Sequence, residues 1–356
     1  MSGLSALLPD ELASVLCLSP RYRGRQIFDW IHKQLVFDFS AMSNLPESLR
    51  NRLKEFAGVI GLSVDARLDD ADGAVKFRFQ LPDGHAVESV ILRDPRGRLT
   101  ACLSTQVGCA MGCVFCRTGA MGFVRNLTAE EIVYQYLLLR SVLRDREMHG
   151  SGDLTVSAEL SAVVFMGMGE PLANPENLER AVEVLTFSGF SARRITISTC
   201  GLVEGIRRLG RRLPEPRLAV SLVSAEPQTR SVLMPVNRSN PLPELRRALI
   251  EYQAAAGKRV TLEIVLIAGV SDRPEDVEAL VRFIHGAQMQ APLKVLVNLI
   301  PWNPLPEFRY RRPDARRVDW FRRRIRQAGI PATTRISRGS AVCGACGQLG
   351  GAQSPA

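Results

Sequence analysis

The sequence has no apolar run long enough for a membrane-spanning helix, which needs about 18 or more consecutive residues. Its N-terminus has neither the basic segment nor the small-residue cleavage site of a secretory signal. We therefore expect a cytoplasmic protein that contacts no membrane. Disulfides seldom persist in that compartment, so the eight cysteines are not expected to form a structural disulfide framework.

Histidine is also scarce, with 4 among 356 residues and none between positions 85 and 148. Lysine is far outnumbered by arginine, and the net charge is +10. Basic side chains release counterions when they meet phosphates, so this surplus favours a polyanionic partner such as RNA. A general bias towards arginine explains the surplus equally well. The densest stretch, 309–326, is interpreted either as an RNA-contacting segment or as a solvated amphipathic helix.

Short β-forming runs alternate with helical segments from about residue 99 onward, which predicts parallel βαβ units and an α/β fold. The candidate strands are Leu99–Ser104, Ala162–Met166, Arg194–Ser198, Arg217–Ser221, Val260–Val265 and Val295–Leu299. Six units are too few for a complete eight-stranded barrel. They fit a partial six-unit (β/α) barrel or an open doubly wound sheet, and in both the chemistry lies at the carboxyl ends of the strands.

The chain divides into four predicted parts. Residues 1–60 are expected to form a small basic helical domain that binds RNA, and residues 61–97 a linking β-hairpin with its turn at Pro82-Asp-Gly. Residues 98–340 form the α/β core. Residues 341–356 form a C-terminal loop that carries Cys346.

Three cysteines, Cys109, Cys113 and Cys116, follow directly on the first core strand. An iron–sulfur cluster normally takes four cysteine ligands, so three would leave one iron open to a small chelating ligand. A zinc ion would need a fourth cysteine or histidine nearby, and Cys102 could serve only by reaching back along its strand. A trio of buried structural cysteines is the remaining alternative.

A second motif, Gly167-Met-Gly-Glu170-Pro, follows the second core strand. Glycines at a strand end let a ligand approach the backbone closely, and Glu170 could accept hydrogen bonds from an ammonium group. A tight turn between strand and helix is the alternative interpretation.

The CxxxCxxC spacing, with an aromatic residue before the last cysteine and the glycine-rich segment after it, resembles the radical S-adenosylmethionine (SAM) superfamily. Further segments resemble the RlmN/Cfr family, and the resemblance runs from about residue 20 to 351. They are Thr105-Gln-Val-Gly-Cys, Gly122-Phe-Val-Arg-Asn-Leu, Ile197-Ser-Thr-Cys-Gly, Asn298-Leu-Ile-Pro-Trp-Asn-Pro and Ala345-Cys-Gly-Gln-Leu-Gly-Gly. That family methylates adenosines of large-subunit ribosomal RNA, and its RlmN members also act on tRNA.

The resemblance implies a role for each matching residue. The 4Fe–4S cluster would be held by Cys109, Cys113 and Cys116. Cys346 would carry the methyl group, Cys102 would resolve the intermediate, and Glu88 would accept a proton. The SAM contacts would come from Gly169, Glu170, Ser198, Ser221, Leu222, Val223 and Asn303. The implied partners are 23S rRNA and tRNA, an electron donor such as flavodoxin or ferredoxin, a thiol reductant and two SAM molecules per turnover.

The chemistry explains the two extra cysteines. Carbon 2 of adenine is electron-poor and cannot attack a sulfonium methyl group, whereas a Cys346 thiolate can. A second SAM then yields the radical that activates this methyl group, which adds to the ring and tethers the RNA to the protein. Cys102 breaks the tether by thiol attack and leaves a Cys102–Cys346 disulfide for a reductant to reset.

Some alternatives stay open. Cys343 is a second candidate for the working thiol, and Glu88, on an alternating strand, could be solvated. Val223 stands where the family usually has His, so a side-chain contact would be lost there while backbone contacts survive. The product could also carry its methyl group on carbon 8, as in Cfr, or the chain could be a non-enzymatic iron–sulfur RNA-binding protein.

Overall fold

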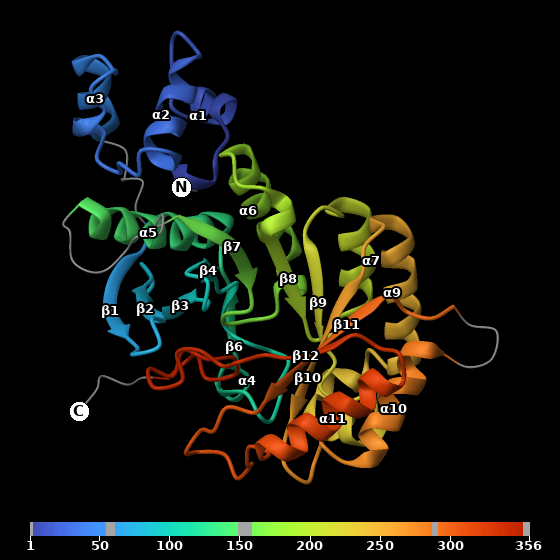
Figure 1. The fold of residues 1–356 in the computed structure, drawn as a ribbon. Coiled ribbons are helices and arrows are strands. Elements are labelled where there is room, and N and C mark those ends of the chain that lie inside the picture. The colour runs from blue at the N-terminus through green and yellow to red at the C-terminus, as the bar shows by residue number, and fades with distance from the viewer. Residues whose placement is uncertain (1–2, 55–60, 149–158, 287–290, 352–356) are drawn as a thin grey trace.

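The computed structural model describes residues 3–54, 61–148, 159–286 and 291–351. A ten-stranded sheet forms its centre, in the order β1-β2-β3-β4-β7-β8-β9-β10-β11-β12 (Figure 1). Its strands are β1 (Ser63–Asp69), β2 (Val75–Gln80), β3 (Ala86–Arg93), β4 (Leu99–Cys102), β7 (Leu160–Phe165), β8 (Ile195–Thr199), β9 (Arg217–Ser221), β10 (Val260–Leu266), β11 (Val295–Pro301) and β12 (Ala332–Thr334). A separate two-stranded sheet pairs β5 (Gln106–Gly108) with β6 (Phe123–Asn126).

Neighbouring strands from β4 to β12 all run parallel, as the alternating pattern predicted. The six candidate strands are present, and the sequence missed only the three-residue β12 among the parallel strands. The sheet stays open, with β1 and β12 at its two edges. The helices of this region are α4 (Arg117–Ala120), α5 (Ala129–Met148), α6 (Pro175–Phe187), α7 (Val203–Arg212), α8 (Pro227–Leu233), α9 (Leu242–Ala256), α10 (Pro274–His285) and α11 (Ala315–Gln327).

The start of α5 shows how local chemistry fixes an element. Thr128 Oγ1 accepts a hydrogen bond from the Glu131 N–H at 3.2 Å, and the Glu131 carboxylate accepts one from the Thr128 N–H at 2.9 Å. This reciprocal pair satisfies two N–H groups that the first helical turn leaves unpaired, so the helix begins there.

The predicted hairpin is part of the main sheet. β2 and β3 pair antiparallel around the turn at Pro82-Asp-Gly, and β3 continues the sheet by pairing antiparallel with β4. The register places Val90 opposite Cys102, on the same face of the sheet as Glu88 two residues earlier. The hairpin therefore brings Glu88 towards the cysteine-bearing end of β4.

The N-terminal helices α1 (Pro9–Val15), α2 (Arg23–His32) and α3 (Glu47–Lys54) sit above α5 and α6 (Figure 1). Phe28 packs edge-to-face on Phe187 of α6, with ring centroids 5.2 Å apart. Arg140 of α5 donates to the His32 carbonyl at 2.6 Å. His32 itself is only 1% exposed and stacks on Phe28, so it is a core residue.

Burial lowers the pKa of His32 to about 3, which makes stability depend on pH. The unfolded chain binds this proton near pH 6.5 and the folded chain only near pH 3, so stability is full above pH 6.5 and falls as pH drops towards 3. We expect His32→Phe to remove a slope of up to about 1.4 kcal/mol per pH unit in that window, measured by urea unfolding. His285→Gln, at an exposed histidine, should leave the slope unchanged; an equal effect of both variants would contradict this.

Candidate active site

The three clustered cysteines lie in the loop that joins β5 to β6. The two strands pair antiparallel, so residues 109–122 leave the sheet and return to it at one place. A Cβ atom at Gly119 would lie 2.9 Å from both the backbone N and O of Cys113, so only glycine allows the loop to fold back this closely. The short helix α4 starts immediately after Cys116.

Cys109, Cys113 and Cys116 line one cavity. Burial raises the pKa of all three thiols, that of Cys109 to about 11, so an isolated thiolate would be unfavourable there. Hydrogen bonds from the Gly119 and Thr118 backbone lower the pKa of Cys116 and so oppose the effect of burial. Within the described residues, no three Cys, His, Asp or Glu side chains converge as ligands of a single metal ion would.

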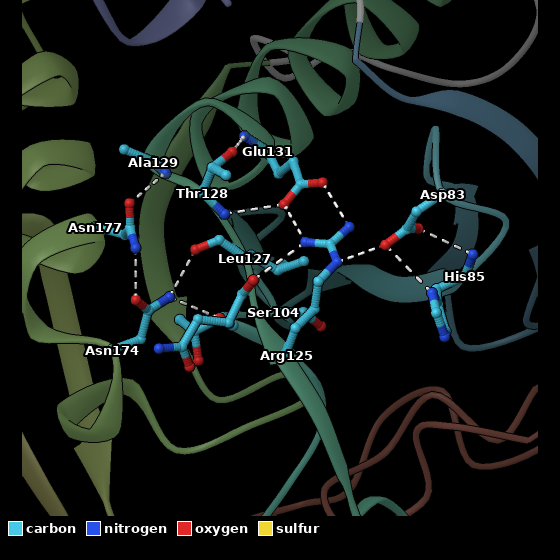
Figure 2. A network of polar contacts seen from close by, with 12 residues as sticks. Asp83, His85, Ser104, Arg125, Leu127, Thr128, Ala129, Glu131, Asn174 and Asn177 are labelled. Carbon is cyan, nitrogen blue, oxygen red and sulfur yellow. Dashed lines mark hydrogen bonds and ion pairs between the residues drawn. The ribbon is translucent and has the colours of Figure 1, made fainter. Parts of the chain in front are cut away.

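A polar network fixes the strand that ends the cysteine loop (Figure 2). Arg125 of β6 makes two hydrogen bonds to the Glu131 carboxylate, at 2.8 and 2.9 Å, and one to Asp83 in the β2–β3 turn at 2.5 Å. Beside it, Asn174 donates to the carbonyls of Leu127 and Thr105 at 2.7 and 2.9 Å. The small sheet is thereby tied to the hairpin, to α5 and to the segment before α6.

The glycine-rich motif forms another wall of the same cavity. Gly169 has φ +98°, and a Cβ atom there would lie 2.5 Å from Gln106 Cβ, so the backbone passes directly over β5. Glu170 is buried and accepts hydrogen bonds from the backbone N–H groups of Leu172 and Cys200, at 3.0 and 2.7 Å. Burial raises the pKa of Glu170, and these hydrogen bonds oppose that rise. The carboxylate is therefore held rigidly at the ends of β7 and β8.

The other predicted SAM-contact positions divide into two groups. Ser198, Ser221 and Asn303 line the cavity with Gly169 and Glu170. Leu222 and Val223 are fully buried beside it and lie outside its lining. Val223 has φ +63°, an uncommon conformation for a β-branched residue, and its N–H donates to the Glu263 carbonyl at 3.1 Å.

The C-terminal loop closes the cavity and places Cys346 in its wall. Asn303 donates to the Cys346 carbonyl at 3.0 Å, and the Thr118 hydroxyl donates to the Leu349 carbonyl at 2.7 Å. The Gly350 N–H donates to Glu88 Oε2 at 2.8 Å. A segment without helix or strand is thus held by side chains from three distant parts of the chain.

Cys102 and Cys346 meet in a second cavity, which shares Met166, Asn303 and Arg335 with the first. Burial, together with a smaller effect of a nearby charge on Cys346, raises the pKa of Cys102 to about 12. Cys343 lies outside the linings of both cavities as far as the described chain extends. The geometry therefore favours Cys346 over Cys343 as the partner of Cys102.

Glu88 is buried, so the idea that it could be solvated is wrong. Its carboxylate lies 3.2 Å from the Lys76 ammonium, and both side chains are at most 6% exposed. It lies outside the linings of the two cavities described above. Its carboxylate contacts Lys76 and the C-terminal loop.

Sequence reasoning missed three charged residues near the site, of which Glu263 and Arg230 are buried and Arg335 is half-buried. Glu263 and Arg335 line the first cavity, and Arg230 lies fully buried behind the cysteine loop. Glu263 interrupts the apolar run of β10, which was a usable signal. Arg335 follows the three-residue β12, and Arg230 lies in a polar helix, so neither stands out in the sequence.

The arginine-rich stretch is mostly engaged within the protein. In α11, Arg322 and Arg323 pair with Asp319, while Arg317 lies over the Trp320 ring and donates to the Asp272 carbonyl. Ahead of the helix, Arg312 reaches Asn303 Oδ1 at 3.4 Å. The loop before α11 is therefore the part of this stretch that adjoins the site.

No helix in the described part of the chain is both long enough and apolar enough to cross a membrane.

Comparison with known proteins agrees with this geometry. Residues 103–284 match the radical SAM superfamily, and residues 19–59 match the N-terminal domain of ribosomal RNA large subunit methyltransferases. A crystal structure of a radical SAM methyltransferase from Sphaerobacter thermophilus is 42% identical, covers 98% of this chain and 99% of its own, and superposes with a TM-score of 0.89. The chain is thus a radical SAM protein with that superfamily's α/β fold.

Its relatives define the family more closely. A probable dual-specificity RNA methyltransferase RlmN from Treponema pallidum is 41% identical over 98% of this chain and 97% of its own length. The dual-specificity RNA methyltransferase RlmN of Syntrophobacter fumaroxidans is 42% identical over 92% and 91%. The chain belongs to the RlmN family.

The network in Figure 2 makes a testable prediction about Arg125. Arg125→Ala leaves the buried Glu131 and the Asp83 carboxylate without their shared cation, and should cost about 1–3 kcal/mol of unfolding free energy. Arg125→Lys should recover only part of this, because lysine cannot make the two-pronged contact. Urea unfolding measures both, and the exposed Arg96→Ala serves as control with a change within about 0.5 kcal/mol. An Arg125→Ala effect no larger than the control's would contradict the role given to the network.

Proposed function

We propose that this chain methylates carbon 2 of an adenosine in 23S rRNA, and of an adenosine in tRNA, through a methyl group carried on Cys346. The observation that carries the proposal is the position of Cys346: it lines the cavity of the three clustered cysteines and also the cavity of Cys102. The Cys346 sulfur can therefore react with a group bound in the first cavity and with Cys102 in the second. An iron–sulfur protein that only bound RNA would need neither Cys102 nor Cys346.

The residues fit the two groups that the family uses. Cys109, Cys113 and Cys116 would hold a 4Fe–4S cluster, and their three sulfurs leave one iron for SAM. Gly169, Glu170, Ser198, Ser221 and Asn303 would surround SAM, with backbone contacts added by Leu222 and Val223. When bound, the cluster supplies the electron that cleaves SAM, and SAM supplies both the methyl group and the radical that activates it.

Cys346 acts first as a nucleophile, so its thiol must lose a proton. The Arg335 guanidinium is placed to favour this, because it lines both cavities and charges on Cys346, Glu263 and Cys102 raise its pKa. The Cys346 backbone is fixed by Asn303, so the sulfur stays between the two cavities.

Cys102 acts last. Its pKa of about 12 keeps it a thiol at neutral pH, and Arg335 lowers the cost of ionising it. Its sulfur attacks the Cys346 sulfur, and the electron pair of the broken carbon–sulfur bond leaves with the RNA-linked carbon, which becomes a methyl group on protonation. The resulting Cys102–Cys346 disulfide requires an external thiol reductant before the next turnover. Glu88 remains a predicted proton acceptor for the ring, and its hydrogen bond to Gly350 would couple that role to the loop.

The proposed partners follow from this chemistry. RNA would contact the basic loop before α11 and the basic N-terminal helices, with the target base leaving its stack to reach the cavity. The cluster would take its electron from a flavodoxin or ferredoxin, and the reaction would take place in the cytoplasm.

Cys102→Ala should stop the reaction after the RNA has been attached to Cys346. With SAM, a reductant and ribosomal RNA, up to one RNA per protein should accumulate as a covalent adduct, seen as a shifted band and mapped to Cys346 by mass spectrometry. The wild-type chain should release RNA instead, and nucleoside analysis separates a carbon-2 from a carbon-8 product.

Cys343→Ala is the matched control, since it removes a thiol three residues from Cys346 that lies outside both cavities. It should turn over like the wild type and leave no adduct. Free RNA only, with Cys346 unmethylated in the Cys102→Ala variant, would contradict the proposal.

A further inference from the structure

Arg230 of α8 is the largest side chain that is completely buried in the described structure, at 0% exposure. Its Nη2 donates to the Cys200 carbonyl at 2.8 Å. Its Nε and Nη1 have no hydrogen-bond partner among the described residues. A buried guanidinium normally satisfies its donors, because leaving a charged group unpaired in the interior is costly.

The groups that face Arg230 belong to the cysteine site. Cys200, whose carbonyl Arg230 binds, and Cys113 both line the first cavity; burial lowers the pKa of Arg230, and charges on these two thiols oppose that lowering. The helix that carries it is joined to the cysteine loop, since the Val114 N–H donates to the Leu233 carbonyl at 3.1 Å. Arg230 thus lies behind the cysteine loop at Cys113, and its Nε and Nη1 donors have no partner among the described residues.

Other buried charges nearby are compensated within the protein. Glu170 accepts two backbone N–H groups, and Glu263 accepts a hydrogen bond from Asn298 at 2.8 Å. Arg246 of α9 is 8% exposed and donates to the carbonyls of Phe283 and Ala291. Arg230 differs from these residues because two of its guanidinium nitrogens have no partner among the described residues.

We infer that Arg230 is the internal counter-charge of the iron–sulfur cluster, acting through the thiolate of Cys113. The inference rests on the cluster binding that the proposed function requires. Three ligated thiolates bring negative charge into a buried site, and the orphaned guanidinium supplies the compensating cation. Because reduction adds one more negative charge, Arg230 also makes the cluster easier to reduce, since net charge and hydrogen bonds to the sulfurs set its potential.

The first experiment measures the cluster in the full-length, anaerobically reconstituted protein without RNA. Arg230→Met removes the charge at similar length, Arg230→Lys keeps the charge, and Arg246→Met is the control for losing a buried arginine elsewhere. In a redox titration followed by electron paramagnetic resonance, Arg230→Met should lower the ratio of reduced to oxidised cluster at a fixed potential about tenfold, a shift of about 59 mV to more negative values. Arg230→Lys and Arg246→Met should titrate close to the wild type.

The second experiment compares melting temperatures with and without the cluster. Without the cluster, Arg230 is an unpaired buried charge, so apo Arg230→Met should melt at a temperature no lower than that of the apo wild type. Cluster binding should raise the melting temperature of Arg230→Met by less than it raises that of the wild type. Loss of the cluster from Arg230→Met alone, with an unchanged apo melt, also supports the inference.

An unshifted potential in a fully loaded Arg230→Met protein would overturn the inference, as would an apo form of this variant that fails to fold while Arg246→Met folds. If the wild-type chain itself binds no cluster, the proposed function fails. An unshifted potential in a loaded Arg230→Met protein contradicts only the role of Arg230, so the two failures can be told apart.

Discussion

The site depends on a C-terminal loop that has no helix or strand of its own and yet must hold one sulfur atom between two cavities. Hydrogen bonds from Asn303 and Thr118 to loop carbonyls and from the Gly350 N–H to Glu88 contribute to this. They come from the end of β11, the cysteine loop and β3, so each part of the sheet adds a constraint. Because conformational entropy opposes ordering of such a segment, the loop stays in place only while all these parts are folded.

The separate two-stranded sheet must likewise be held in a fixed position. It carries the cysteine loop but, in the part of the chain that the structure describes, pairs with no strand of the main sheet. It is held by a backbone hydrogen bond from the Gln106 N–H to the Met168 carbonyl at 3.2 Å and by side chains: Arg125 is shared between Glu131 and Asp83, and Asn174 binds the backbone on either side of β5 and β6. The geometry of the three thiols is therefore set by polar contacts among elements that lie far apart in the main sheet.

Local patterns predicted the six core strands and the cysteine and glycine motifs, because these depend on residues close together in the sequence. The burial of Glu88 was not predictable in this way, since its partner in the C-terminal loop is 262 positions away. Arg335 and Arg230 were missed for the same reason, because the cysteines near each of them are distant in the sequence and come close only in the folded chain. The three residues of β12 are too few to show a period.

Val223 shows what the fold requires at one turn beside the site. Its left-handed backbone is a conformation that a β-branched residue adopts with strain and that histidine, the residue that the family resemblance predicts here, tolerates better. The chain nevertheless keeps the turn, and with it the hydrogen bond to the Glu263 carbonyl that joins the end of β9 to β10. This hydrogen bond uses the backbone of Val223 alone, so the turn depends on the path of the backbone and not on which side chain it carries.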